Sequence, residues 1–197
     1  MKKKILALTL CVVMAAIAIV GGTLAYFTDT DKTANTFTVG NIDINLTEPK
    51  WDAIGEKEAA DVYPGEALAK DPTVTNIGAN PCFVRIKVTN LDPFGADNMI
   101  TYRTDYVEGA LGTDWERHTD GYFYYTKVLA AGATTDALFD QIVMPVGLTN
   151  NAEAEPIVVY AEAVQAQGAR PSFSAVEAMT VAEISDWFTA CMPANNG

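Results

Sequence analysis

The chain has 197 residues, enough for one domain with a sizeable hydrophobic core. It carries 13 Lys and Arg against 25 Asp and Glu side chains, for a formal net charge of −12 at pH 7. Such acidity disfavours nucleic-acid binding, because that binding depends on basic side chains that neutralise phosphates. The same acidity suits an extracellular protein and favours divalent cations weakly.

A membrane-directed leader begins the chain. Lys2–Lys4 precede a run from Ile5 to Val20 that is apolar apart from Thr9 and is followed by two glycines. Thr23 and Ala25 place small residues at positions −3 and −1 of a cut after Ala25, as an export peptidase requires. We therefore predict a cleaved signal peptide, with Tyr26 as the first residue of the mature protein.

A retained membrane anchor is the alternative to a cleaved signal peptide over residues 1–25. A membrane span needs about twenty apolar residues, and the apolar run reaches that length only when the two glycines and Leu24 are counted. No basic cluster follows the run to stop translocation. Cys11 lies too early in the run for a lipid-attachment site, so we interpret it as an apolar filler. Cleavage would remove three lysines and no acid, leaving 10 basic against 25 acidic side chains and a net charge of −15.

Cys82 and Cys191 are the cysteines that remain after cleavage. An exported protein can oxidise such a pair, so a disulfide between them is one interpretation. The other is that each thiol packs as a small hydrophobic side chain. The sequence leaves both open, because it does not show whether the two Cα atoms approach bonding distance.

The first half of the mature chain contains three segments with strand-like alternation. The first runs from 36 to 46 and is interrupted by Gly40; a loop with an amphipathic turn around Trp51 follows it. Tyr63–Glu66 has proline and glycine at its centre, which is a type II turn signal. We expect the next two segments to pair as an antiparallel hairpin through Asn76 and Gly78, which tolerate positive φ. These segments are Thr73–Asn76 and 82–91, and the second should have one apolar and one solvated face.

The second half continues the pattern. Four further strands are expected at 99–107, 122–129, 134–144 and 156–167, with a turn at Gly132 and a polar loop at 109–120 that contains Trp115 and His118. About seven short strands separated by turn signals predict a mainly β protein, an antiparallel sandwich of two sheets in a single domain over residues 36–197.

The tail predicts an amphipathic helix at about residues 174–191. Ser174 to Glu177 and Thr180 to Glu183 are both capping-box patterns. One side of the helix would carry the apolar side chains Val176, Met179, Ile184, Trp187, Phe188 and Cys191. We expect this helix to pack on the sandwich; a helix that binds a partner is the alternative.

Catalytic side chains are scarce. His118 is the only histidine, so a zinc site of the His-Glu-x-x-His kind cannot form, and no Gly-x-Ser-x-Gly nucleophile motif is present. The acid pairs Asp29/Asp31 and Asp92/Asp97 lack the dense oxygen pattern of a calcium loop, and we interpret them as solvated turns. We therefore expect a protein without catalytic residues, resident metal or cofactor, and not an enzyme.

Two stretches resemble a known family. GGTLAYFTDT followed by ANTFTVGNIDINL resembles the export signal and first strand of the TasA/camelysin family, and 63–88 is similar to that family's Pro-Gly turn, paired strand and Asn-x-Gly turn. The resemblance covers residues 21 to about 91; beyond them only the pattern agrees. It implies a jelly-roll topology, processing by a SipW-type signal peptidase, and a secreted protein of the extracellular matrix or cell surface.

Cleavage after Ala25 would release an extended segment over residues 26–35 with two aromatic side chains and no proline. In TasA-like proteins the mature N-terminus complements a neighbouring subunit, so the resemblance implies an assembly strand at Tyr26, Phe27, Thr28 and Asp29. A frayed terminus, or a strand within its own domain, is the alternative. We expect a structural protein that forms or decorates biofilm fibres with copies of itself or related matrix subunits, and that meets the membrane only through an uncleaved leader.

Two other functions stay open. A camelysin-type surface metallopeptidase is the first, because relatives of that type are classed as such, although the single histidine departs from the usual zinc motif. A monomeric adhesin is the second, with aromatic loops around Trp51, Trp115 and Tyr122 as its binding surface.

Overall fold

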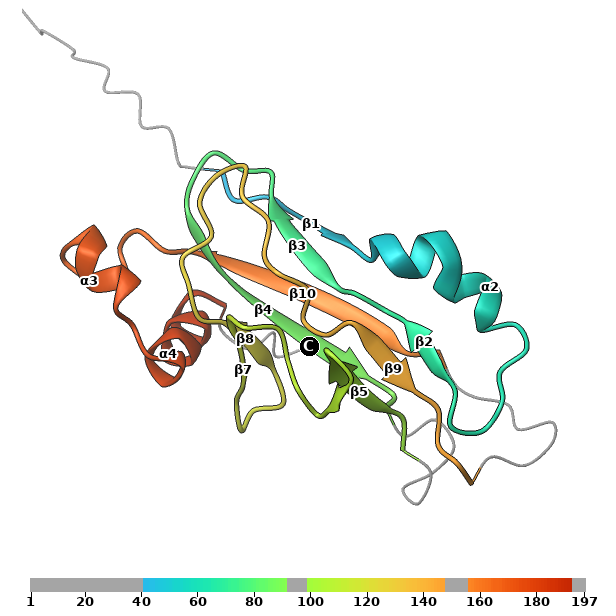
Figure 1. The fold of residues 1–197 in the computed structure, drawn as a ribbon. Helices are drawn as coiled ribbons and strands as arrows, with labels where there is room; N and C mark the ends of the chain where they lie inside the picture. Colours follow the sequence, from blue (N-terminus) through green and yellow to red (C-terminus); the bar gives the residue numbers. More distant parts are fainter. Residues whose placement is uncertain (1–40, 92–98, 148–155, 193–197) are drawn as a thin grey trace, which may run out of the picture. The chain divides into compact units, whose positions relative to one another are not determined.

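The computed structural model describes residues 41–91, 99–147 and 156–192 (Figure 1). The predicted leader with Thr23 and Ala25, the assembly segment 26–35 and both acid pairs lie outside the described residues, so the hypotheses about them stay predictions. The same holds for the first part of the strand predicted from residue 36.

The described residues form three antiparallel sheets. A two-stranded sheet joins β1 (Ile44–Thr47) to β3 (Thr73–Asn76). A four-stranded sheet has the order β10 (Val158–Gln165), β4 (Cys82–Thr89), β8 (Phe123–Tyr125) and β7 (Trp115–Arg117). Another has the order β2 (Ala67–Ala69), β9 (Gln141–Val143), β5 (Thr101–Thr104) and β6 (Val107–Glu108). The mainly β, antiparallel sandwich predicted from the sequence is thereby confirmed, but its strands form three sheets where two were predicted.

The main core lies between the sheets. On β4, the alternate side chains of Cys82, Val84 and Ile86 are buried in it, as the sequence pattern predicted. Residues of the other strands and of their connections complete this core, among them Leu68, Val74, Leu138, Phe139 and Ile142. The opposite face of β4 is not solvated along its whole length, because Phe83 is only 1% exposed.

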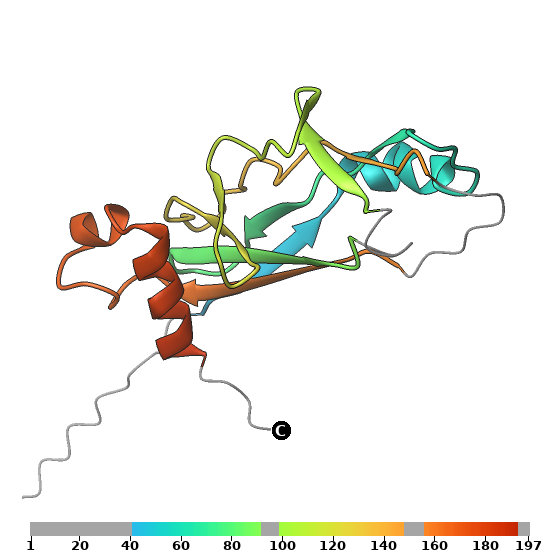
Figure 2. The same ribbon diagram turned by 90° about the horizontal axis from the view of Figure 1, so that it is seen from below.

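A second core covers that end of β4. Phe83 packs there with Val164 of β10 and with Ile184 and Phe188 of the C-terminal helix. Figure 2 shows the helix, drawn in red, lying across the end of this sheet. The expectation that the tail packs on the sandwich is confirmed.

The tail forms two helices instead of one. These are α3 (Phe173–Glu177) and α4 (Val181–Cys191). Ser172, not Ser174, caps α3, because its hydroxyl accepts the Ala175 N–H at 3.3 Å. The capping box of Thr180 and Glu183 is present at the start of α4. Within the described residues, no helix is long and apolar enough to span a membrane.

The predicted hairpin between residues 73–76 and 82–91 is wrong. β3 pairs with β1, whereas β4 pairs with β10 and β8. Neither Asn76 nor Gly78 has a positive φ. The Asn76 amide instead donates to the carbonyl oxygens of Asn80 and Leu129, at 2.9 and 3.1 Å. These bonds hold a crossing from one sheet to another, and glycine is needed at 78 because a Cβ there would lie 2.6 Å from the Asp43 nitrogen.

Four predicted segments change in extent. The expected strand at 99–107 is broken after Thr104 by Asp105 and Tyr106, whose φ values of 50° and 66° turn the chain back into β6. The loop predicted at 109–120 contains β7. The strands predicted at 122–129 and 134–144 are shortened to β8 and β9, while Gly132 does turn the chain, at a φ of 77°.

The loop predicted around Trp51 is mostly helical. It contains η1 (Trp51–Gly55), a π-helical turn, followed by α2 (Glu56–Glu58). The side chain of Asp71 caps the start of this helical stretch. Its Oδ1 accepts hydrogen bonds from the backbone N–H groups of Lys50 at 2.8 Å and of Trp51 at 3.4 Å. A side chain at Gly55 would clash with the carbonyl oxygen of Ala69, so glycine lets the stretch lie against β2.

Candidate functional site

The outer edge of β10 carries backbone groups that pair with none of the described strands. Ala166 N–H donates to the carbonyl of Pro81 at 3.0 Å, in the same register as the β10–β4 ladder. Because hydrogen-bonded pairs alternate in an antiparallel ladder, Val159, Ala161 and Ala163 direct their N–H and C=O groups away from β4. Among the described strands, only β4 pairs with β10. An eight-residue strand therefore presents an open edge.

The outer edge of β1 is open in the same way. Ile77 N–H donates to the Asp43 carbonyl at 2.9 Å, which places Asn45 and Thr47 in hydrogen-bonded pairs with β3. Ile44 and Leu46 consequently point their backbone groups away from β3. In the described part of the chain, β3 is the only strand paired with β1, and β1 approaches β10 (Figure 2).

A groove of about 240 Å³ lies where the end of β1 meets the start of β10. It is lined by Leu46, Thr47, Glu48, Asp52, Lys70, Ile157 and Val159. We call the two open edges together with this groove the β1/β10 seam. The apolar walls are Leu46, Ile157 and Val159, which also pack on the main core.

Glu48 and Lys70 form an ion pair inside the seam. Lys70 Nζ donates to Glu48 Oε2 at 2.8 Å, and the ammonium group lies 4.5 Å from the centre of the Trp51 ring. Lys70 is only 4% exposed, so this charge is held by its carboxylate partner and by the aromatic face. The pair fixes η1 onto β2 and forms the polar end of the groove.

A polar network holds α4 against the sheet. The Tyr124 hydroxyl donates to Asp120 Oδ2 at 2.7 Å and accepts from Arg85 Nη1 at 3.0 Å. Ser185 of α4 is buried beside it, with its Oγ 3.1 Å from the same hydroxyl. Arg85 continues the network to Glu162 at 2.6 Å. Strands β4, β8 and β10 are thus tied to the C-terminal helix by hydrogen bonds as well as by packing.

The ionisation of this network follows from its contacts. Burial raises the pKa of Asp120, but the hydrogen bonds from Tyr124 and from the Tyr122 N–H, together with the nearby His118, outweigh it and the pKa is lowered. Burial is the main cause that raises the pKa of Tyr124. Asp120 is therefore charged and Tyr124 protonated at neutral pH.

His118, Asp120 and Ser185 do not form a catalytic triad. In a triad the histidine lies between the serine and the acid and takes the serine proton. Here Asp120 lies in the middle, 3.3 Å from His118 Nδ1 on one side and 3.3 Å from Ser185 Oγ on the other. Ser185 is also buried on the side of α4 that faces the sheet, so a substrate has no access to its hydroxyl.

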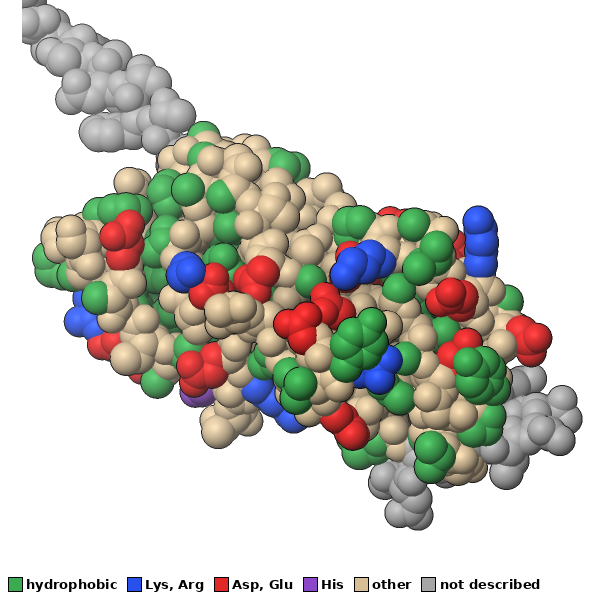
Figure 3. All heavy atoms as spheres, viewed as in Figure 1, with side chains coloured by type: hydrophobic (Ala, Val, Ile, Leu, Met, Phe, Trp, Pro, Cys, Tyr) green, Lys and Arg blue, Asp and Glu red, His purple; other side chains and the backbone are tan. Residues whose placement is uncertain are grey.

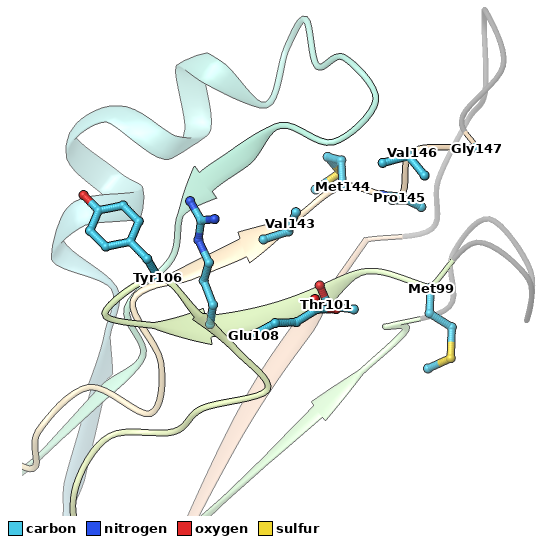
Figure 4. Close-up of a pocket in the computed structure, with 10 residues that line it drawn as sticks. Met99, Thr101, Tyr106, Glu108, Val143, Met144, Pro145, Val146 and Gly147 are labelled. Atoms are coloured by element: carbon cyan, nitrogen blue, oxygen red, sulfur yellow. The ribbon is translucent and has the colours of Figure 1, made fainter.

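A second groove of about 420 Å³ lies over β5 and β9 (Figure 4). Tyr106 and Val146 stand at its margins and are 83% and 85% exposed. Acidic side chains are spread over the face shown in Figure 3, with apolar and basic ones among them. The groove over β5 and β9 is lined by both polar and apolar side chains. The sequence predicted none of these residues as a binding residue.

The aromatic surface suggested for an adhesin is not formed as expected. Trp115 is only 6% exposed, and its indole N–H donates to the Asp136 carbonyl at 2.9 Å. Tyr122 lies under the guanidinium group of Arg85, 3.9 Å from the ring centre, and Trp51 packs on Lys70. Trp115 is therefore a core residue, which corrects its assignment to a binding loop.

The two cysteines are free thiols in the structure. Cys82 is buried in β4, where burial raises its pKa to about 11, whereas Cys191 is exposed at the end of α4. The interpretation of Cys82 as a small buried hydrophobic side chain fits this position. The Cys82–Cys191 disulfide is not formed.

One comparison with known proteins gave a match. Residues 1–92 match the family model of camelysin metallo-endopeptidase. The camelysin match agrees with the resemblance found at residues 21 to about 91, and it supports a surface or exported protein. It covers the predicted leader, β1, β2, β3 and β4, and therefore includes one edge of the seam. Neither the curated proteins nor the solved structures gave a match.

The camelysin name implies a metal, which the described side chains do not fit. A catalytic zinc needs three protein ligands. Over residues 41–91, 99–147 and 156–192, no three His, Cys, Asp or Glu side chains converge. His118 and Asp120 meet as a pair only, and the Asp120 oxygens already accept from Tyr124 and from the Tyr122 N–H.

Proposed function

We propose that this chain is an exported structural protein whose copies assemble, alone or with related matrix subunits, into extracellular fibres. In this account, the signal peptide is removed after Ala25, and residues 26–35 of one copy add as a strand to the β1/β10 seam of the next. The observation that carries the proposal is the open edge of β10, where the N–H and C=O groups of Val159, Ala161 and Ala163 pair with no described strand.

An open edge of this length is a template for pairing with another chain. Strand addition satisfies the main-chain groups, while alternate side chains of the added strand fill apolar pockets. The seam offers both elements, since open edges of β1 and β10 flank apolar walls at Leu46, Ile157 and Val159. Soluble proteins normally protect such edges, and a donor strand from a neighbour protects this one.

A pair of matched substitutions tests the edge. Val158 on β10 and Val107 on β6 are exposed valines, 51% and 59%, on edge strands of different sheets. A lysine on an edge strand opposes the addition of another strand. We expect Val158→Lys to raise the protein concentration needed for fibre formation, measured by sedimentation, and Val107→Lys to leave it unchanged. Equal behaviour of the two variants would remove the β10 edge from the proposal.

A proline substitution on β10 provides a second test of strand addition. Ala161→Pro deletes one outward N–H group and leaves the β4 ladder intact, because the Ala161 N–H points away from β4. We expect it to block fibre formation, with circular dichroism used to verify that the variant still folds. Normal fibres from a folded Ala161→Pro protein count against strand addition at β10.

A surface metallopeptidase is the second candidate, favoured by the name of the family that residues 1–92 match. Metal analysis of the purified mature protein and a casein-cleavage assay with added Zn²⁺ decide it. We expect no cleavage above background. Cleavage that is abolished by a chelator and by His118→Ala would replace the structural role with the enzymatic one.

A further inference from the structure

The seam contains a buried polar atom that has no hydrogen-bond partner among the described residues. Oε2 of Glu48 accepts from Lys70, whereas Oε1 is buried and receives a hydrogen bond from none of the described residues. A buried carboxylate oxygen without a donor is costly. A turn of the Glu48 carboxylate toward the groove that it lines would let this oxygen accept from an N–H donor of a ligand there.

The charge of the groove selects the kind of donor. Its ionisable side chains are Glu48, Asp52 and Lys70, which together carry one net negative charge. Asp52 is exposed and forms no ion pair within the described ranges. A small cation with several N–H groups complements such a site, and its uncharged remainder can pack on the apolar walls.

We propose that this groove binds the α-ammonium group of Tyr26 from a second copy of the chain. The inference rests on the proposed function, which brings residues 26–35 of one copy to the seam of another. Only the Tyr26 end of that segment is a free chain end, because Asn35 continues into the rest of the protein. Signal-peptide cleavage thus creates the charged group that the groove recognises.

The direction of the strands agrees with this placement. β1 ends at the groove, where Thr47 and Glu48 line it, and β10 begins there, next to Ile157 and Val159. A donor strand antiparallel to β1 therefore starts at the groove. Its ammonium group meets Glu48, while the following residues extend along the open edges of Leu46 and Val159. The groove sets both the register and the polarity of the added strand.

Nα-acetylation of the mature protein tests the inference, because it removes the terminal charge without changing any side chain. The probe is the full mature chain beginning at Tyr26, with a free or an acetylated terminus. We expect acetylation to raise the critical concentration for assembly about tenfold, the factor for losing one hydrogen bond to a charged group. Glu48→Gln should have a similar effect on the free form and no further effect on the acetylated form.

Two more variants complete the design. Glu56→Gln changes an exposed acid on α2 outside the groove and should leave the critical concentration unchanged. Asp52→Asn leaves the Glu48–Lys70 pair intact, so it replaces Glu48→Gln if that variant fails to fold, with an expected increase of about threefold in the free form alone. Equal assembly of free and acetylated protein overturns amine recognition but leaves strand addition standing. Absence of assembly in both forms overturns the proposed function itself.

Discussion

The indole N–H of Trp187 on α4 donates to the carbonyl oxygen of Gln165 at 2.8 Å. Gln165 is the last residue of β10, and its backbone groups belong to the edge that faces away from β4. The C-terminal helix thus closes one end of this edge and leaves Val159, Ala161 and Ala163 open. The β1/β10 seam is accordingly bounded by Trp187 at one end. At the other end lies the groove that Glu48 lines.

Trp187→Phe should destabilise the fold modestly. The substitution keeps most of the aromatic packing but leaves the Gln165 carbonyl without its donor, so we expect a loss of about 1 kcal/mol in the free energy of unfolding. Urea denaturation followed by circular dichroism measures it. A variant as stable as the parent would show that the bond contributes nothing to holding α4.

Tyr124→Phe should cost more. Removing this buried hydroxyl takes one hydrogen bond each from Asp120 and Arg85, and we expect a loss of about 2 kcal/mol. Tyr106→Phe is the matched control, because Tyr106 is 83% exposed. Both variants are compared by urea denaturation, and equal stabilities would refute the role given to the network under α4.

Asp120 should make the stability depend on pH in the acid range. Its pKa is lowered in the folded state, so its contribution is present above the unfolded-state pKa of about 3.9 and is lost as the pH falls through the lower folded-state value. Asp120→Asn should therefore be less stable than the parent at pH 7, with a smaller difference at about pH 2.5. Thermal unfolding across this range measures the difference, and a constant gap would contradict the assignment.

The caps of the two C-terminal helices can be separated by alanine substitutions. Thr180→Ala removes one half of the α4 capping box and should cost about 1 kcal/mol. Ser172→Ala should destabilise the protein and Ser174→Ala should not, because only Ser172 caps α3. Urea midpoints of the three variants check the order, and a larger effect at Ser174 would mean that the helix begins elsewhere.

The cysteines should differ in reactivity. Cys82 is buried with a pKa of about 11, whereas Cys191 is exposed, so a disulfide reagent should label one thiol rapidly in the native mature protein and two after denaturation. Cys191→Ser should abolish the rapid reaction. Two thiols that both resist labelling in native protein would instead indicate that the pair is oxidised.

Local patterns predicted the elements best. Residues 73–76, the core face of β4, β10 and the Thr180–Glu183 capping box follow from alternation or from short-range motifs, which depend on neighbouring residues. The pairing of the strands did not follow in the same way. Asn76 and Gly78 are typical residues of a hairpin turn, yet the Asn76 amide donates to Leu129, a residue far along the chain. The segment is a crossing between sheets instead.

The seam itself could not be predicted, because its members come together only in the fold. Glu48 follows one strand and Lys70 follows another, and the two meet through an ion pair that no spacing rule indicates. One signal was available: Lys70 and Asp71 are adjacent charges directly after the apolar strand Ala67–Ala69. A charge that is buried at the end of such a strand needs an oppositely charged partner. The exposure of the β10 edge depends on strand order, which alternation does not give.

Electron microscopy of two purified proteins tests the central claim most directly. One begins at Tyr26 and carries the proposed donor strand, and the other begins at Thr36 and lacks it. Under the same assembly conditions, the first should form fibres and the second should remain monomeric. If both stay monomeric, or if both form the same fibres, addition of the N-terminal strand to the β1/β10 seam is not how this protein assembles.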